Sequence, residues 1–199
     1  MSYTAIFLAS QSPRRAELLR QIGVEFQQHS VDIDETPWVG ESAGDYVQRL
    51  AVEKAEAGWQ WQLANIAGTP LAAMGSDTSV VLAGEIMGKP ANREQGLSML
   101  KRLSGHTHQV MTAVALQYQQ HCLSALSVTD VAFREIGDAE LEAYWQTGEP
   151  FDKAGAYAIQ GQAAVFVERI SGSYSGVVGL PLSETHRLLT DMEKIINHE

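Results

Sequence analysis

Six residues near the start of the chain, Ser-Gln-Ser-Pro-Arg-Arg at positions 10–15, have the composition of an anion-binding turn. Ser12 is a favoured helix N-cap, and Pro13 takes the favoured first position of a helix. The free N–H groups at such a helix start attract anions, and the guanidinium groups of Arg14 and Arg15 suit phosphate oxygens. This turn is therefore a candidate phosphate site, with a capped helix carrying two solvated arginines as the structural alternative.

Asp77 is a candidate for catalysis or metal binding, because it stands directly before the apolar run of a strand. A carboxylate in such a place is costly unless it is paired or binds a cation. It can hold Mg²⁺ or activate a water for attack on a phosphate. An aspartate bonded to its own turn is the alternative. Lys54 and Lys89 can each neutralise a phosphate, although surface lysines are common.

A third candidate segment covers residues 149–161, where charged residues flank a run of small ones and an amide follows, at Gln160. Glycine and alanine let a ligand approach the backbone closely. Gln160 can donate and accept at once, which fits the edge of a nucleotide base. A surface loop leading into a strand is the alternative. The sequence leaves open whether Lys153 contacts phosphate or pairs with Asp152.

Two further patterns carry less weight. The glycine-rich segment 172–181 fits neither a P-loop nor a dinucleotide-binding pattern, and we expect a loop that leads into the terminal helix. His106 and His108 share one side of a predicted strand. No other His, Cys or acidic cluster lies near them in sequence, so they do not indicate a metal site.

The elements that must position these residues alternate between strands and helices. This pattern predicts an α/β fold with a mixed central sheet flanked by helices. We expect strands at 4–9, 24–31, 76–82, 107–118, 122–133 and 163–170, and helices at 13–22, 42–61, 92–103, 138–147 and 181–196. Residues 83–85 are expected to form a hairpin turn.

The sequence also predicts the buried face of one helix, the cap of another and the number of domains. Tyr46, Leu50 and Ala57 should form the inner stripe of the helix at 42–61, and Asp138 should cap the helix that it begins. We find no repeat, low-complexity tract or linker, so residues 1–199 are expected to form a single domain.

Composition excludes several classes of protein. The net charge of −10 argues against binding to the nucleic-acid backbone, and no apolar run is long enough to span a membrane. Cys122 is the only cysteine and no secretory signal is evident, so we expect a cytoplasmic protein without disulfides. An acidic protein can still bind a triphosphate if its few cations converge on one site and a divalent metal assists.

Taken together, these segments resemble the Maf family of nucleotide pyrophosphatases over nearly the whole chain. One such block alone would not identify the family, but many blocks in the same order and at suitable spacing are specific to it. The blocks that carry the resemblance are 10–15, 34–35, 49–51, 54–55, 76–78, 88–90, 103–105, 108–112, 152–157 and 178–181. Ser76, Ala158 and Gly176 depart from the residues that are common in the family.

The resemblance implies an elongated, two-lobed fold with a central cleft, similar to the inosine triphosphate pyrophosphatases. It also implies a homodimer and a divalent cation such as Mg²⁺, Mn²⁺ or Co²⁺. Asp77 is the implied catalytic residue, and Glu35 would bind the metal with it. The implied phosphate-binding residues are Ser10, Arg14, Arg15, Lys54 and Lys89, and the implied specificity residues are Arg14, Thr78 and Gln160.

The activity that the resemblance implies is hydrolysis of dTTP and UTP, and of modified pyrimidine triphosphates, to the monophosphate and pyrophosphate. Thr78 and Gln160 favour this pyrimidine interpretation, because the sister subfamily that acts on 7-methyl-GTP typically has Gln and Glu at these positions. An amide suits the mixed donor and acceptor edge of a pyrimidine. The alternatives are a 7-methyl-GTP pyrophosphatase and a nucleotide-binding regulator of cell division or septum formation without enzymatic activity.

Overall fold

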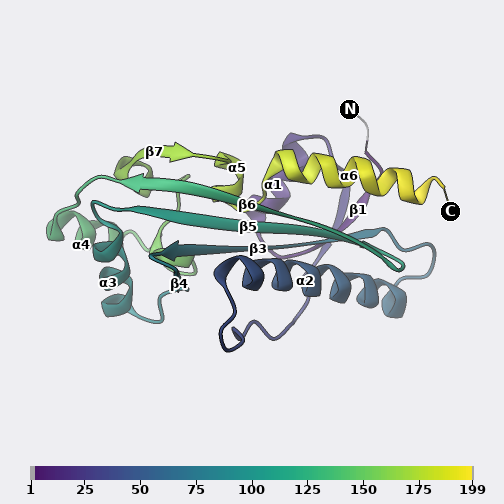
Figure 1. Cartoon of the computed structure of the whole chain (residues 1–199), viewed down its shortest axis with the longest axis horizontal. Coiled ribbons are helices and arrows are strands. Elements are labelled where there is room, and N and C mark those ends of the chain that lie inside the picture. Colours follow the sequence, from purple (N-terminus) through teal and green to yellow (C-terminus); the bar gives the residue numbers. More distant parts are fainter. Residues whose placement is uncertain (1–2, 199) are drawn as a thin grey trace.

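The computed structural model describes residues 3–198, and a single sheet runs along the length of an elongated molecule (Figure 1). The strand order is β2-β1-β3-β5-β6-β7, with β4 paired to β3. The pairs β1–β2 and β1–β3 are parallel and the other pairs are antiparallel, so the predicted mixed sheet is confirmed. The strands are β1 (Ile6–Ala9), β2 (Phe26–His29), β3 (Ala72–Leu82), β4 (Glu85–Met87), β5 (Thr107–Tyr118), β6 (His121–Phe133) and β7 (Val167–Ser171).

The helices cover both faces of this sheet. The α-helices are α1 (Pro13–Gln21), α2 (Ala43–Asn65), α3 (Arg93–Leu103), α4 (Asp138–Gln146), α5 (Tyr174–Val178) and α6 (Leu182–Ile196), and the 3₁₀ turns are η1 (Ala154–Ala156) and η2 (Gln162–Phe166). Helix α2 packs on β3 and β5, and α6 packs on β5 and β6 from the opposite face (Figure 1). None of the helices in residues 3–198 has the length and apolar content needed to cross a membrane.

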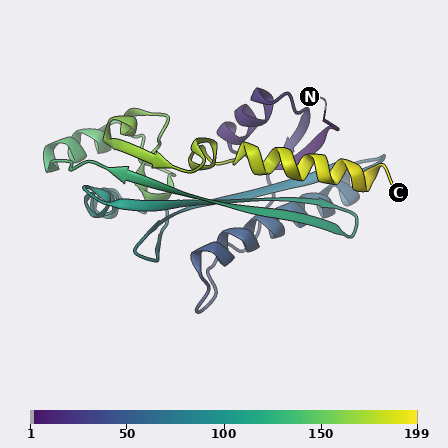
Figure 2. The same cartoon turned by 45° about the horizontal axis from the view of Figure 1, so that its top comes forward.

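The ends of the molecule form two lobes joined by the long strands β3, β5 and β6 (Figure 2). We call β1, β2 and α1 the N-terminal lobe, and β4, α3, α4, η1, η2 and β7 the distal lobe. Along its edge, β3 pairs with β1 only over Ala72–Met74 and with β4 only over Val80–Leu82. Between these two paired stretches, no strand of the described residues pairs with residues 75–79 along this edge of β3. This gap in the edge of β3 separates the two lobes.

Helix α2 lies unusually close to the sheet because small residues meet at the contact. Ala51 and Ala55 of α2 are fully buried. A Cβ atom added to Gly75 of β3 would lie 2.2 Å from the backbone oxygen of Ala51 and 2.9 Å from Cβ of Lys54. Such a distance is far inside van der Waals contact, so only glycine permits this approach. The glycine thus brings the backbone of Lys54 directly over the centre of β3.

The buried face of α2 differs from the prediction. Leu50 is fully buried as expected, but Tyr46 and Ala57 are only half-buried. Val47 and Ala51 are the fully buried residues instead. The stripe therefore lies one residue further along the helix, which leaves Tyr46 at the side of the helix.

Three local predictions were wrong. Residues 163–166, expected in a strand, belong to the 3₁₀ turn η2, and the strand β7 begins only at Val167. Asp138 is the first helical residue of α4, and Gly137 is the N-cap, without a side-chain hydrogen bond. The glycine-rich segment 172–181, expected as a loop, contains the short helix α5. Its cap is Ser173, whose hydroxyl accepts a hydrogen bond from the N–H of Gly176.

Candidate functional site

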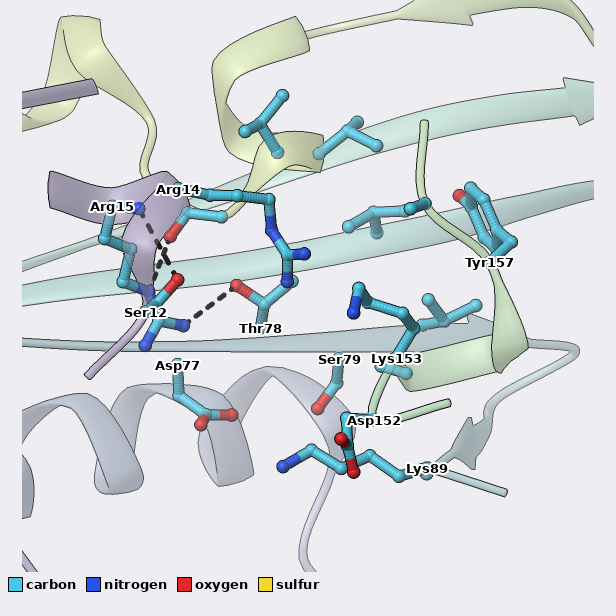
Figure 3. Close-up of a pocket in the computed structure, with 18 of the residues that line it drawn as sticks. Ser12, Arg14, Arg15, Asp77, Thr78, Ser79, Lys89, Asp152, Lys153 and Tyr157 are labelled. Atoms are coloured by element: carbon cyan, nitrogen blue, oxygen red, sulfur yellow. Dashed lines mark hydrogen bonds between the residues drawn. The ribbon is translucent and has the colours of Figure 1, made fainter. Parts of the chain in front are cut away.

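A pocket of about 720 Å³ lies where the gap in the edge of β3 separates the two lobes (Figure 3). Its lining comes from the turn into α1, the loop before α2, the centre of β3, the loop after β4 and residues 152–160. Every residue that the sequence suggested for the site lines this one pocket. These residues are Ser10, Arg14, Arg15, Glu35, Lys54, Asp77, Thr78, Lys89 and Gln160.

Two carboxylates in the pocket share one ammonium group. Nζ of Lys54 lies 2.7 Å from Oδ1 of Asp77 and 2.6 Å from Oε1 of Glu35. The side chains of Lys54 and Asp77 are only 12% and 13% exposed, so this ion pair is shielded from water, whereas Glu35 is half exposed. Burial raises the pKa of Glu35, but Lys54, with Lys89 and Arg15 further away, holds the pKa below its ordinary value. Glu35 is therefore a carboxylate anion at neutral pH.

The loop that carries Glu35 is fastened to α2 by two residues that sequence reasoning did not assign to the site. The hydroxyl of Tyr46 donates to the backbone oxygen of Glu35 at 2.9 Å. Arg49 donates to the backbone oxygen of Thr36 at 3.2 Å and forms a salt bridge with Glu41 at 2.6 Å. The half-buried position of Tyr46 explains why it can reach the loop, and its helical spacing alone gave no sign of this role.

Arg15 connects three segments of the chain that surround the pocket. Its Nε donates to the backbone oxygen of Gly179 at 2.9 Å, and its terminal nitrogens donate to Oγ of Ser10 at 3.2 Å and Oγ1 of Thr78 at 3.3 Å. Burial lowers the pKa of Arg15, although a guanidinium remains charged. All three nitrogens are thus engaged within the protein, and Arg15 braces the α1 turn against β3.

The hydroxyl of Thr78 is part of a short hydrogen-bonded chain. Its oxygen lies 3.0 Å from the hydroxyl oxygen of Thr112 on β5. The same hydroxyl oxygen of Thr112 lies 2.8 Å from the backbone oxygen of Gly176. Thr112 is the donor in both contacts, and because a hydroxyl carries a single proton, the hydroxyl of Thr78 and the carbonyl of Gly176 share it. Thr78 also accepts from Arg15. Thr112 was not singled out from the sequence, since its role depends on the cross-strand pairing with Thr78.

The two consecutive residues Asp77 and Thr78 point to opposite faces of the sheet, as alternate residues of a strand do (Figure 3). Asp77 turns toward α2, where it meets Lys54, and Thr78 turns toward Arg15. The pocket reaches both faces because β3 has a free edge there. Side chains from both faces can therefore act on one bound molecule.

Gln160 lies in the turn that follows the 3₁₀ segment η1. It is exposed, lines the pocket and makes no hydrogen bond within the described part of the chain. Its amide is therefore available to a ligand. Asp152, also in the pocket wall, is exposed and adopts a positive φ of 59°.

His106 and His108 differ in exposure and in their hydrogen-bonding partners. His108 is 1% exposed, and its Nε2 lies 2.8 Å from the hydroxyl of Tyr157, while Nδ1 has no partner in the described structure. Burial lowers the pKa of His108 to about 4. His106 is exposed and its Nδ1 lies 2.7 Å from the backbone oxygen of Ser104. His108 thus supports Tyr157, which lines the pocket from the distal lobe.

A divalent cation would find part of a ligand set at Glu35 and Asp77. Each carboxylate uses one oxygen for Lys54, and the other oxygen has no hydrogen bond within residues 3–198. No group of three or more His, Cys, Asp or Glu side chains suited to a metal occurs in these residues. Mg²⁺ commonly takes one or two carboxylates and completes its shell with water and substrate phosphates. The donor set fits an ion of that kind, arriving with an anionic substrate.

Comparisons with known proteins show the family to which the chain belongs. A family model described as Maf-like protein matches residues 5–192. A dTTP/UTP pyrophosphatase of Pseudoalteromonas atlantica is 56% identical over 187 residues, covering 94% of this chain and 96% of the relative. The proteins of the same name from Saccharophagus degradans and Shigella dysenteriae are 56% and 51% identical, and cover 94% and 96% of this chain and 89% and 95% of their own. The chain belongs to the Maf family.

Proposed function

We propose that this member of the Maf family hydrolyses dTTP and UTP to the nucleoside monophosphate and pyrophosphate in the pocket at the edge of β3. The observation that carries the proposal is the joining, in one pocket, of an Asp77–Lys54–Glu35 centre with cations from both lobes. Relatives that share half or more of its residues over nearly the whole chain have the name dTTP/UTP pyrophosphatase.

Asp77 is the proposed catalytic residue. Its second carboxylate oxygen orients a water and takes its proton as the water oxygen bonds to the α-phosphorus. The bond between the α-phosphorus and the bridging oxygen to the β-phosphorus then breaks, and pyrophosphate leaves. Lys54 holds the carboxylate in one orientation through its 2.7 Å contact with Oδ1. A positioned base of this kind contributes about 10²–10⁴-fold to the rate.

Glu35 and Asp77 are the proposed ligands of a divalent cation such as Mg²⁺, Mn²⁺ or Co²⁺. The ion would supply positive charge that offsets the charge developing on the phosphate oxygens. The centre is suited to this, since two carboxylates and one ammonium leave a net negative charge. The observation in support is the free second oxygen on each carboxylate.

Phosphate binding is the proposed role of the cationic residues, Arg14 among them, and base recognition is the proposed role of Gln160. Gln160 makes no hydrogen bond within the described residues, so its amide can pair with the edge of a pyrimidine. Thr78 has its hydroxyl between Arg15 and Thr112. We propose that Thr78 affects specificity by holding Arg15 in place, and that Ser10 does the same from the α1 turn.

The experiment that tests the function is phosphate release from a panel of triphosphates, with added inorganic pyrophosphatase and Mg²⁺ or Mn²⁺. The panel contains dTTP, UTP, CTP, ATP, GTP and 7-methyl-GTP. We expect hydrolysis of dTTP and UTP above the others. Preference for 7-methyl-GTP would overturn the assignment of Gln160, and no turnover with any metal would favour the regulator of cell division.

Assembly and location belong to the same proposal. We propose a cytoplasmic homodimer in which residues 1–199 form one domain. One sheet links the two lobes, and the only cysteine, Cys122, is free, as suits a reducing compartment. Light scattering on the purified protein tests the dimer, because a mass of one chain, 21.7 kDa, would contradict it.

A further inference from the structure

Five cationic side chains line the pocket, and the structure divides them into two kinds. Lys54 and Arg15 are engaged within the protein, Lys54 by two carboxylates and Arg15 by three oxygen acceptors. The other cations are Arg14, Lys89 and Lys153. None of these three forms a salt bridge within residues 3–198, although the chain carries more acidic than basic residues. Three neighbouring cations outside any salt bridge of the described residues are suited to binding an anion.

Lys153 is the least expected member of this group. Its Nζ donates only to the backbone oxygen of Phe151, at 3.3 Å, and it forms no ion pair with the adjacent Asp152. Figure 3 shows its side chain directed into the pocket, toward the side from which Arg14 enters. Burial lowers the pKa of Lys153, and the nearby positive charges of Arg14 and Lys89 lower it further, against the opposing effects of Asp152 and Glu149. The ammonium therefore lies near two other cations of the pocket.

The turn that presents Lys153 is held in a fixed geometry. The N–H of Gly155 donates to the backbone oxygen of Gly88 at 3.1 Å, which ties this turn to the loop that carries Lys89. Gly155 has a φ of 67°, and a Cβ atom there would lie 2.9 Å from Val80, so a larger residue does not fit. The two lysines thus belong to one connected unit of the distal lobe.

Backbone strain marks the same turn. Asp152 and Ala156 have φ values of 59° and 61°, which L-residues other than glycine adopt at an energetic cost. Such strain persists where the surrounding structure enforces it, and it clusters at ligand-binding sites. Lys153 lies between the two residues, one position after Asp152 and three positions before Ala156.

We propose that Lys153, with Lys89 and Arg14, forms a three-point clamp for the β- and γ-phosphates, and that it retains the pyrophosphate leaving group. The proposal rests on the function proposed above. In Figure 3 Lys153 lies further along β3 than Asp77 does, so a substrate whose α-phosphate meets Asp77 can extend its β- and γ-phosphates toward Lys153. Arg14 closes the clamp from the N-terminal lobe, so both lobes hold the same anion.

The test is the binding of inorganic pyrophosphate, measured by calorimetry on the full-length protein with and without Mg²⁺. We expect Lys153→Met to weaken binding roughly tenfold or more and Lys153→Arg to restore most of the affinity. The matched control is Lys101→Met, because Lys101 is an exposed lysine paired with Asp138 away from the pocket. Unchanged pyrophosphate affinity in folded Lys153→Met would overturn the clamp.

A second measurement uses the unaltered protein and does not depend on the folding of a variant. Acylation of lysines by an amine-reactive reagent, read out by mass spectrometry, should slow at Lys153 and Lys89 when pyrophosphate is present. Lys101 should react at the same rate with and without pyrophosphate. Equal labelling of Lys153 in both conditions contradicts the proposal.

The outcomes also separate this inference from the proposed function. If the Lys153→Met variant hydrolyses dTTP as well as the unaltered protein does, with unchanged KM, the function stands and the clamp is lost. A protein that hydrolyses no triphosphate, yet binds pyrophosphate through Lys153, loses the function and keeps the clamp. If Lys153→Met raises KM for dTTP and weakens pyrophosphate binding, and Lys153→Arg restores KM, both the proposed function and the clamp are supported.

Discussion

The ammonium group of Lys54 on α2 lies 2.7 Å from Oδ1 of Asp77 on β3. The contact joins a helix to the one part of β3 that has a free edge, and it exists because Gly75 allows α2 to approach. Glu35 joins the same ammonium at 2.6 Å. The three groups form a mostly buried centre whose charge and orientation underlie the predictions that follow.

Replacing Asp77 by Asn should lower kcat for dTTP by about 10²-fold or more, because the shape is kept and the base is lost. Steady-state kinetics with a pyrophosphate-coupled assay measures this. Asp130→Asn, an exposed change on β6 away from the pocket, is the matched control. Activity near that of the unaltered protein in Asp77→Asn would remove Asp77 from its role.

Glu35→Gln should raise the Mg²⁺ concentration needed for half-maximal activity by roughly tenfold or more, since one anionic ligand is lost. Chelation with EDTA should abolish activity in both proteins, and added Mg²⁺ or Mn²⁺ should restore it. Glu85→Gln serves as the control, because Glu85 pairs with Arg102 on the surface. An unchanged metal requirement in Glu35→Gln would mean that Glu35 does not hold the ion.

Thr112→Val should reduce the free energy of unfolding by about 1–3 kcal/mol, because the buried carbonyl of Gly176 and the hydroxyl of Thr78 each lose a partner. It should also raise KM more than it lowers kcat, since Thr78 then holds Arg15 less firmly. Urea unfolding and kinetics give the two values. Thr112→Ser keeps the hydroxyl, and its failure to restore KM would contradict the chain of hydrogen bonds.

Stability should fall as the pH is lowered on account of His108. The pKa is about 4 in the folded protein, against an ordinary value near 6.5, so below pH 6.5 the unfolded chain binds a proton that the folded chain excludes. The free energy of unfolding should therefore drop by up to about 3 kcal/mol between pH 6.5 and 4 from this residue. His108→Gln should flatten that part of the urea-derived profile, and the exposed His106→Gln should leave it unchanged.

Gly75→Ala should destabilise the fold by about 1–3 kcal/mol or more and lower kcat, because the new methyl group forces α2 away from β3. Nζ of Lys54 would then lose its short contact with Asp77. Gly137→Ala is a suitable control, since a Cβ atom there meets nothing within 4 Å. Thermal unfolding and steady-state kinetics on both variants measure the two effects. A Gly75→Ala variant with unchanged stability and unchanged kcat would contradict the close packing of α2 on β3.

The order and type of most elements could be predicted, because their apolar periodicity is strong and their caps are clear. Ser12 and Ser42 cap their helices as expected. The short helix α5 and the turn η2 escaped prediction, since five residues carry too little periodicity. The position of Tyr46 also escaped, because a shift of the buried stripe by one residue depends on the sheet beneath it.

Within the site, residue identity was predictable and residue role was less so. Arg14 and Arg15 are alike in sequence, yet only Arg15 finds acceptors within the described residues, at Ser10, Thr78 and Gly179. That difference follows from the roughly 100° turn between neighbouring helical residues and from a loop 164 positions away. The connection between the segments that carry Lys89 and Lys153 was equally hidden, since it is made by the long-range hydrogen bond between Gly155 and Gly88.

The strands β3, β5 and β6 have 11, 12 and 13 residues and pass from one lobe to the other without a break. At about 3.3 Å per residue each is close to 40 Å long, and a twisted sheet of paired strands resists bending across its ladder. The two sides of the pocket are therefore joined by the same three strands. The length of these strands sets the spacing of the two lobes, and a substrate that contacts both lobes at once has to match that spacing.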